Sequence, residues 1–344
     1  MVNAICRELV LRKEEVSGAV ETIYFGGGTP SLLTSGELQQ IFEVVEEHYA
    51  ISEAPEITLE ANPDDLSEKK IKMLAASPVN RLSIGVQSFF EQDLKLMNRA
   101  HNEKEALESI QTATRFFDNI SIDLIYGIPG MSNERWRENL RIALELGVPH
   151  ISSYSLTVEP RTALKTLIEK GKIAPVEEEA AREQYEIMID ILEAAGFENY
   201  EFSNFGMPGY FSQNNTAYWF GKAYLGIGPS AHSFDGKNRK WNIRNNSLYI
   251  RSIEKGEVPE EKEELSLSDR YNELVMTRLR TKWGISLVEV EKLFGKSYLD
   301  YLLNESRKLI ADGMLEIQDE HLKVSKKAKF LSDGIAAELF FVEE

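Results

Sequence analysis

The feature that most limits what this chain can fold into is a repeated alternation of strand-like and helix-like segments. Short runs rich in Ile, Leu, Tyr and Phe alternate with stretches whose apolar residues recur at helical spacing. The strand-like runs are residues 21–27, 55–63, 79–88, 119–127 and 150–160, and the helical stretches are residues 35–49, 67–76, 104–117, 132–146 and 162–195. This order predicts an α/β fold in which parallel strands are joined by crossover helices.

Local signals mark where several helices start and stop. Ser35, Ser67 and Ser132 stand at the starts of helical stretches, where a serine hydroxyl can accept a bond from a backbone amide, so we expect them as N-caps. The stretch 162–195 contains Gly171 and Pro175, which predict a break and therefore more than one helix.

Polar and glycine residues follow the strand-like runs. In parallel α/β folds, ligands bind at the carboxyl-terminal ends of the strands. The ends carry Gly26-Gly27-Gly28-Thr29-Pro30, Glu60-Ala61-Asn62-Pro63, Gln87-Ser88, Asp123 with Gly127, and Thr157 with Glu159. We expect a ligand-binding face there. The alternative for Glu60 and Asp123 taken singly is an ordinary turn or capping role.

Composition limits the partners. The 344 residues carry a net charge of −17 without a basic patch, which disfavours nucleic acid and anionic membranes. No apolar run predicts a transmembrane segment or a signal peptide. Cys6 is the only cysteine, so the chain has no internal disulfide, and the five histidines show no metal-ligand spacing. These features predict a cytoplasmic protein without a metal site of its own.

The second half of the chain changes character twice. Residues 200–234 are rich in aromatic residues, which form either core or a flat apolar ligand site. The acidic run 254–269 is interpreted as a solvated linker. Residues 265–344 predict three helices, a hairpin at 314–325 and a last helix, a small winged-helix-like module. We expect domains at 1–205, 206–262 and 263–344.

The N-terminal stretch predicts a helix that starts at Met1 without a capping residue. The first strand, residues 22–25, would then lie at an edge of the sheet. We therefore expect the chain to begin partway into its first repeat.

Seven motifs and the C-terminal module together resemble the radical S-adenosylmethionine (SAM) superfamily, and more closely the HemW haem chaperones, relatives of the oxygen-independent coproporphyrinogen III oxidases. The motifs are "GGGTPSLL", "EANP", "RLSIGVQSF", "LMNRAH", "DLIYGIPG", "YSLTVEP" and "AYWFGKAYLGIGPSAHSF". The resemblance runs along nearly the whole chain.

The resemblance implies a partial (β/α)6 barrel, missing its first strand here, that holds SAM across the strand ends. It assigns Gly26, Gly27, Gly28 and Thr29 to the amino group of SAM, Glu60 and Gln87 to its polar ends, Arg99 to its carboxylate and Asp123 to the ribose. Thr157 and His232 fall near the adenosine in the relatives. The planar fork of arginine suits a carboxylate.

Other roles are open for two of these side chains, and His101, which has no assigned binding role, has a structural interpretation. Arg99 is also explained by an ion pair with Glu91 or Asp93. His232 is also explained as a hydrogen-bonded core histidine, and His101 as a surface or hinge residue.

The sequence departs from the family in two places. The family binds a [4Fe–4S] cluster through a C-x3-C-x2-C loop, which is absent here, and Cys6 is expected in the core of the first helix. We expect the loop to be absent because the sequence is N-terminally incomplete. The alternative is a descendant of the family that has lost the cluster. The second departure is Asn214, which replaces the histidine of a haem-associated His-Asn-x-x-Tyr-Trp motif and has no imidazole.

The leading functional prediction is a haem chaperone that binds haem and passes it to an unidentified acceptor protein. The alternative is an enzyme, oxygen-independent coproporphyrinogen III dehydrogenase, which acts on a porphyrinogen. A third alternative is a SAM-binding barrel with neither activity. No catalytic residue is assigned.

Overall fold

The computed structural model describes residues 1–160 and 162–342. The chain divides into two compact units. The first unit comprises residues 1–22, 34–55 and 212–344, and the second comprises residues 23–33 and 56–211. The predicted domain boundaries at 205/206 and 262/263 stay a prediction.

A seven-stranded sheet organises the second unit, in the order β1-β2-β3-β4-β5-β7-β6. Its strands are β1 (Val20–Phe25), β2 (Ile51–Ala61), β3 (Arg81–Gln87), β4 (Asn119–Tyr126), β5 (His150–Ser155), β6 (Glu198–Glu201) and β7 (Asn204–Gly206). β2 to β5 run parallel, and β7 pairs antiparallel with both β5 and β6. The five predicted strands are confirmed, whereas β6 and β7 lie where loop was expected.

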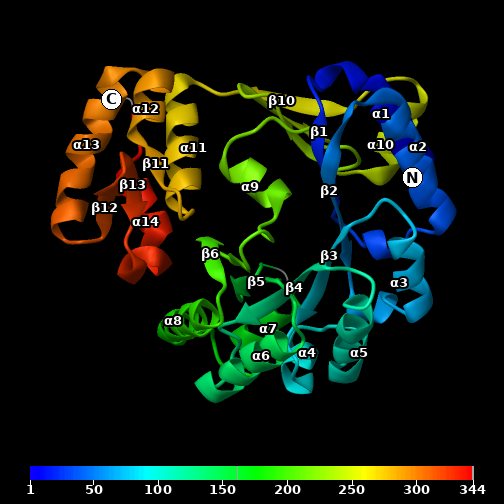
Figure 1. The fold of residues 1–344 in the computed structure, drawn as a ribbon, viewed down its shortest axis with the longest axis horizontal. Helices are drawn as coiled ribbons and strands as arrows, with labels where there is room; N and C mark the ends of the chain where they lie inside the picture. The colour runs from blue at the N-terminus through cyan, green and yellow to red at the C-terminus, as the bar shows by residue number, and fades with distance from the viewer. Residues whose placement is uncertain (161, 343–344) are drawn as a thin grey trace. The chain divides into compact units, whose positions relative to one another are not determined.

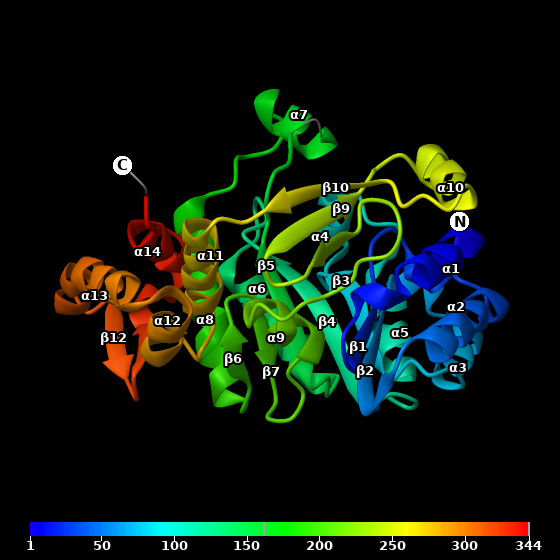
Figure 2. The same cartoon turned by 90° about the horizontal axis from the view of Figure 1, so that it is seen from above.

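The helices that connect these strands cover one face of the sheet. They are α3 (Glu68–Ala75), α4 (Glu91–Leu96), α5 (Glu103–Ala113), α6 (Asn133–Glu145) and α8 (Glu178–Ala194). Figure 1 shows α8, α6, α5 and α3 as a row along that face. The break near Gly171 and Pro175 is confirmed, because α7 (Ala163–Glu169) is separate from α8. Figure 2 shows α7 at the end of two extended connections.

The two faces of the sheet differ because side chains alternate along each strand. One set, including Leu59, Leu82, Ile84, Ile122 and Ile151, is fully buried and apolar. The other set is polar, and its members are Thr58, Glu60, Arg81, Ser83, Ser121, Asp123, His150 and Ser152. The helices therefore pack against an apolar face, and the opposite face presents polar side chains.

Capping explains where two helices begin. Ser67 and Ser132 accept bonds from the amides of Lys70 and Arg135, as predicted. The prediction of Ser35 as a cap is wrong by one residue. Thr34 is the N-cap of α2 (Ser35–His48), and Thr34 and Glu37 form a reciprocal capping box, which satisfies two amides at once.

The first unit contains α1 (Val2–Leu11), η1 (Lys13–Glu15), α2, α9 (Gln213–Trp219), α10 (Asn246–Glu254) and a three-stranded sheet. That sheet is β8 (His232–Phe234), β9 (Asn238–Asn242) and β10 (Glu260–Glu264). β10 lies within the acidic run, so this part of the predicted solvated linker is a strand, and four of its five residues are exposed. Five residues of the run pair antiparallel with β9.

A buried charge network joins α1 to this sheet. Glu8, fully buried, accepts bonds from Gly228 N at 2.8 Å, Asn242 Nδ2 at 2.7 Å and Tyr249 Oη at 2.6 Å. Arg12, 1 % exposed, lies 3.2 Å from both Glu8 and Glu260. The network therefore fixes α1, the 226–228 loop, β9, β10 and α10 to one another.

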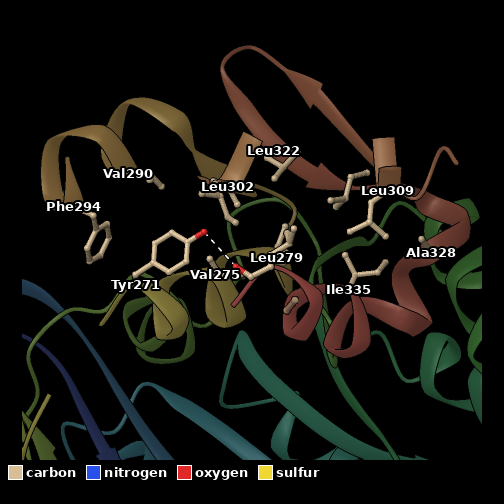
Figure 3. Packing of buried hydrophobic residues seen from close by; sticks show 14 residues of the cluster. Tyr271, Val275, Leu279, Val290, Phe294, Leu302, Leu309, Leu322, Ala328 and Ile335 are labelled. Atoms are coloured by element: carbon tan, nitrogen blue, oxygen red, sulfur yellow. Dashed lines mark hydrogen bonds between the residues drawn. The ribbon is translucent and has the colours of Figure 1, made fainter. Parts of the chain in front are cut away.

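The C-terminal module has its own core. It comprises α11 (Leu267–Leu279), β11 (Ile285–Ser286), α12 (Leu287–Phe294), α13 (Lys296–Ala311), β12 (Leu315–Gln318), β13 (His321–Val324), η4 (Lys326–Leu331) and α14 (Ser332–Glu338). Figure 3 shows Val275, Leu302 and Leu322 within one apolar cluster, and the Tyr271 hydroxyl donates to the carbonyl of Leu339. The predicted three helices, hairpin and last helix are confirmed.

The predicted crowd of aromatic residues at 200–224 divides between the two units. In the second unit, the rings of Tyr200 and Phe211 stack with centroids 4.5 Å apart. In the first, Tyr218 and Tyr224 meet edge to face at 4.6 Å. None of the helices that the structure describes has the length and apolar character needed to cross a bilayer.

Candidate functional site

Nine of the ten predicted site residues belong to the second unit, and eight of these lie in or just beyond its strands, whereas Arg99 follows α4. The glycines follow β1, Glu60 lies in β2, Gln87 ends β3, Asp123 lies in β4 and Thr157 follows β5. Glu60 and Asp123 are strand residues, so the alternative that they are turn residues is wrong. His232 belongs to β8 in the first unit. We call the nine the rim.

The glycine loop is held by Glu60. Its Oε2 accepts from Gly27 N at 3.1 Å, and its Oε1 accepts from the Tyr24 hydroxyl at 2.8 Å. A Cβ at Gly26 would lie 2.6 Å from the Tyr24 ring, and Gly27 and Gly28 have φ of 75° and 65°. Side chains would clash or be strained there, so the loop presents bare, exposed backbone.

Gly85 lets two side chains of the rim lie close to the backbone of β3. It is two residues after Ser83, the strand partner of Glu60, and therefore lies on the same polar face of the sheet. A Cβ at Gly85 would lie 3.0 Å from Gln87 Nε2 and 3.3 Å from Arg99 Nη2. The absence of a side chain therefore gives the Gln87 amide and the Arg99 guanidinium a common space.

Arg99 reaches this space from beyond α4. Its Nη2 donates to Asn62 Oδ1 at 2.9 Å and to the Gly85 carbonyl at 3.0 Å. The alternative of a pair with Glu91 or Asp93 is wrong: Glu91 pairs with Lys95, and Asp93 with Arg135. The guanidinium is thus oriented by the rim.

Gln87 has an unusual backbone. Its φ of 70° lies in the left-handed region, and the pairing of β3 with β4 shifts register between Ile84 and Gln87. Such strain in a residue other than glycine costs of order 1–3 kcal/mol and collects at functional sites. The bulge and the strained backbone together indicate that the position of the Gln87 side chain has a functional role.

Asp123 and Glu60 place two carboxylates on the same face. Burial and the negative charge of Glu60 raise the pKa of Asp123 to about 7, and a hydrogen bond from Ser152 opposes the shift. Burial and Glu60 also raise the pKa of Tyr24 far above its usual value. The rim therefore favours a cationic ligand, which would relieve the repulsion between the carboxylates.

Sequence reasoning missed the polar side chains on the rest of this face. Arg81, 3 % exposed, lies 3.8 Å from Glu56, and its strand partners are Thr58 and Asn119. His150 is held between Ser121 at 2.7 Å and the Tyr200 hydroxyl at 2.8 Å. The sequence did carry a signal for these residues, because polar residues alternate with apolar ones along these strands.

Two histidines differ from expectation. His101, expected at the surface or a hinge, is 3 % exposed, and its Nε2 lies 3.0 Å from the Val86 carbonyl. The alternative of a core role for His232 is wrong, because its side chain is exposed. Within the three-residue strand β8, Ser233 is the buried residue and His232 faces the other way.

The residues present do not fit a [4Fe–4S] cluster, which needs three thiolates. Cys6 is buried in α1 as predicted, with Sγ 3.9 Å from the Gln40 carbonyl, and burial raises the pKa of its thiol. Across residues 1–160 and 162–342, no three His, Cys, Asp or Glu side chains are grouped to hold a metal ion. The expected N-terminal incompleteness stays a prediction.

Comparison with protein families identifies two regions. Residues 5–143 match the radical SAM superfamily, and residues 265–331 match the HemN C-terminal domain. The chain is 34% identical to the heme chaperone HemW of Bacillus subtilis over 92% of this chain and 84% of that protein. It is 34% identical to the heme chaperone HemW of Lactococcus lactis, over 92% and 83%.

A solved structure shares the fold. The coproporphyrinogen III oxidase HemN of Escherichia coli, a radical SAM enzyme, matches with a TM-score of 0.84 over 98% of this chain and 82% of that chain. At 22% identity this likeness concerns the fold alone. It confirms the predicted partial barrel of the radical SAM type with a C-terminal module.

Proposed function

This chain belongs to the HemW family of radical SAM proteins, and from that membership we propose that it binds haem and passes it to an acceptor protein. The observation that carries the proposal is the similarity to proteins named as heme chaperones, which spans more than nine tenths of the chain. The acceptor is unidentified. We also propose a cytoplasmic location, supported by the composition and tested by fractionating the source cells.

Carrying haem is compatible with the side chains present. Transfer of a bound porphyrin needs a binding surface and an exit, and it needs no cluster ligands from this chain. The alternative of a coproporphyrinogen III dehydrogenase rests on the likeness to HemN, which concerns the fold. We therefore favour the chaperone.

We further propose that SAM binds at the rim. The exposed backbone of Gly26–Thr29 and the carboxylate of Glu60 would receive its amino group, and Arg99 its carboxylate. Gln87 would bond a polar end, Asp123 the ribose hydroxyls, and Thr157 would lie near the adenosine. When paired with a cluster, SAM supplies radical chemistry in this superfamily, whereas the residues here bind and orient it.

The geometry supports a cationic amino acid at this place. Two carboxylates favour its sulfonium and ammonium charges, and one guanidinium matches its carboxylate. Gly85 lies beside two of the proposed SAM-binding groups, the Gln87 amide and the Arg99 guanidinium. Calorimetry should show that Asp123→Ala and Gln87→Ala each weaken SAM binding at least tenfold, with Glu68→Ala on the exposed face of α3 as the control. Unchanged affinity in both variants would place the SAM site elsewhere.

The test of the chaperone proposal is haem transfer. Ferric haem titrated into the purified chain should give saturable binding, followed by absorbance. Mixing the loaded protein with a haem-free globin should then move the haem to the globin faster than passive dissociation into buffer does. Turnover of a porphyrinogen would instead favour the dehydrogenase.

A further inference from the structure

The sheet β8–β9–β10 of the first unit has two chemically different faces. On one face, Ser233, Lys240 and Asn242 bond Arg12, Glu15 and Glu8, and are tied to the buried network around α1. The residues that alternate with them, His232, Phe234, Arg239 and Trp241, are exposed or half-buried. The sheet thus fixes a second face that the network does not cover.

This second face is aromatic. His232 is the cross-strand partner of Trp241, with ring centroids 6.1 Å apart. Phe234 lies two residues along the same strand, and its ring is 6.3 Å from that of Tyr224, whose amide donates to the Phe234 carbonyl. We call His232, Trp241, Phe234 and Tyr224 the aromatic face.

Of the five histidines, His232 has the environment of an available ligand. His101 and His150 are buried and hydrogen-bonded, and Nδ1 of His321 bonds the Asp319 carbonyl. The side chain of His232 is exposed, and within the described part of the chain no hydrogen bond engages its ring. His48, at the end of α2, has no aromatic ring paired with it among the described residues.

Asn214 does not offer an alternative. It is 9 % exposed in α9, and its Oδ1 accepts from the Thr22 hydroxyl at 3.1 Å. An amide is a poor ligand for haem iron, whose protein ligands are imidazole, thiolate, thioether or phenolate. A haem iron bound through a side chain of this protein would therefore take its ligand from another position.

Resting on the proposed haem-carrying function, we propose that His232 binds the haem iron and that the porphyrin lies over the aromatic face. Side chains stand roughly perpendicular to a sheet, so the imidazole of His232 projects away from β8. A haem held by this imidazole would be placed next to the rings of Trp241 and Phe234, which lie on the same face of the sheet.

The charges on this face are mixed. Glu261 and Glu263 of β10 are the cross-strand partners of Trp241 and Arg239, and the Trp241 indole donates to Glu261 at 3.1 Å, so Arg239 is the cation that a haem propionate would use. Arg239, the cross-strand partner of Phe234, is 44% exposed and lies 2.9 Å from Glu273. An exposed ion pair of this kind contributes little to stability, so Arg239 can exchange Glu273 for a propionate carboxylate. The only covalent change is the iron–nitrogen bond, which replaces a solvent ligand and leaves the oxidation state unchanged.

The test compares ferric haem binding by the full chain, by His232→Ala and by the control His321→Ala. We expect His232→Ala to weaken binding at least tenfold and to shift the Soret band, and free imidazole to restore the original band. His321→Ala should match the unmutated chain. His232→Gln provides a second variant that keeps a polar side chain, and circular dichroism checks that both fold.

The outcomes separate this inference from the function on which it rests. An unchanged Soret band and affinity in both His232 variants, with normal binding by the unmutated chain, would overturn His232 as the ligand and leave the chaperone proposal standing. Absence of saturable haem binding by the unmutated chain would overturn both. Loss of the band in the His232 variants alone, with imidazole rescue, supports the assignment.

Discussion

The shape of the rim depends on glycines, which have no side chain, as much as on the side chains that are present. Gly26 and Gly85 keep side chains out of two places where Tyr24, Gln87 and Arg99 already lie close. Gln87 adopts a left-handed backbone that a β-strand rarely accepts. These positions are therefore sensitive to changes as small as a methyl group.

We expect Gly85→Ala to weaken SAM binding at least tenfold with little loss of stability. The added methyl would push against Gln87 Nε2 and Arg99 Nη2, both of which end flexible side chains. Calorimetry with SAM measures the affinity, and thermal unfolding measures the stability. Gly36→Ala, in α2 with open space around it, is the matched control. Equal affinities for the two variants would contradict the placement.

Asp123 gives the protein a specific pH dependence. Its pKa is about 7 when folded, and an unfolded Asp titrates near 3.9, so the folded chain binds more protons between these values. Its contribution to stability is therefore full below about pH 4 and is lost as the pH rises through 7. Urea unfolding at pH 5 and pH 8 should show the unmutated chain losing stability relative to Asp123→Asn. A pH-independent difference would show that the carboxyl is not shifted.

Eight of the nine rim residues lie in or just after strand-like runs, so their places in the fold could be predicted from the sequence, whereas Arg99 follows α4 and was assigned through the family resemblance. What sequence could not supply was their partners. Tyr24 and Asn62 were near the motifs, but their bonds to Glu60 and Arg99 depend on how neighbouring strands align. Arg81 and His150 lay inside strands that were interpreted by their apolar residues alone.

At the scale of elements, the spacing of apolar residues predicted the long strands and the helices, but it did not predict the short strands. β6, β7 and β8 have four, three and three residues, too few for an alternating pattern to be distinguished from loop. β10 is wholly charged, and its pairing with β9 is specified by neighbours such as Lys240, which lies 3.2 Å from Glu260. Its structure depends on tertiary contacts.

The α1 network should be a strong point of stability in the first unit. Arg12→Ala leaves Glu8 buried without its cationic partner, which typically costs about 3–5 kcal/mol. Chemical denaturation should show this loss, whereas Arg141→Ala, on the exposed side of α6, should show no measurable change. A neutral Arg12→Ala would mean that the hydrogen bonds of Glu8 suffice alone.

At the scale of the whole molecule, the C-terminal module holds an apolar core of its own. Fourteen buried hydrophobic residues form that cluster, all between Tyr271 and Leu339. A separate core is what allows a segment to fold as a unit. The match of residues 265–331 to the HemN C-terminal domain covers most of this segment.

We expect a fragment of residues 265–342 to fold alone and to unfold cooperatively on heating. Within it, Leu302→Ala should reduce the free energy of unfolding by about 2–5 kcal/mol, because Leu302 is fully buried. Leu293→Ala, at a position 44% exposed, is the control. A fragment without a cooperative transition in circular dichroism would show that the module depends on the rest of the chain.

The polar inner face of the large sheet has a calorimetric consequence. Unfolding usually raises the heat capacity by about 12–15 cal/mol/K per residue, because apolar surface dominates what is exposed, while exposed polar surface lowers it. Here unfolding would hydrate Thr58, Arg81, Ser121 and His150 together with the apolar side chains. The heat-capacity increment of this protein should therefore be slightly smaller than that of a chain of equal length whose sheet buries apolar side chains on both faces.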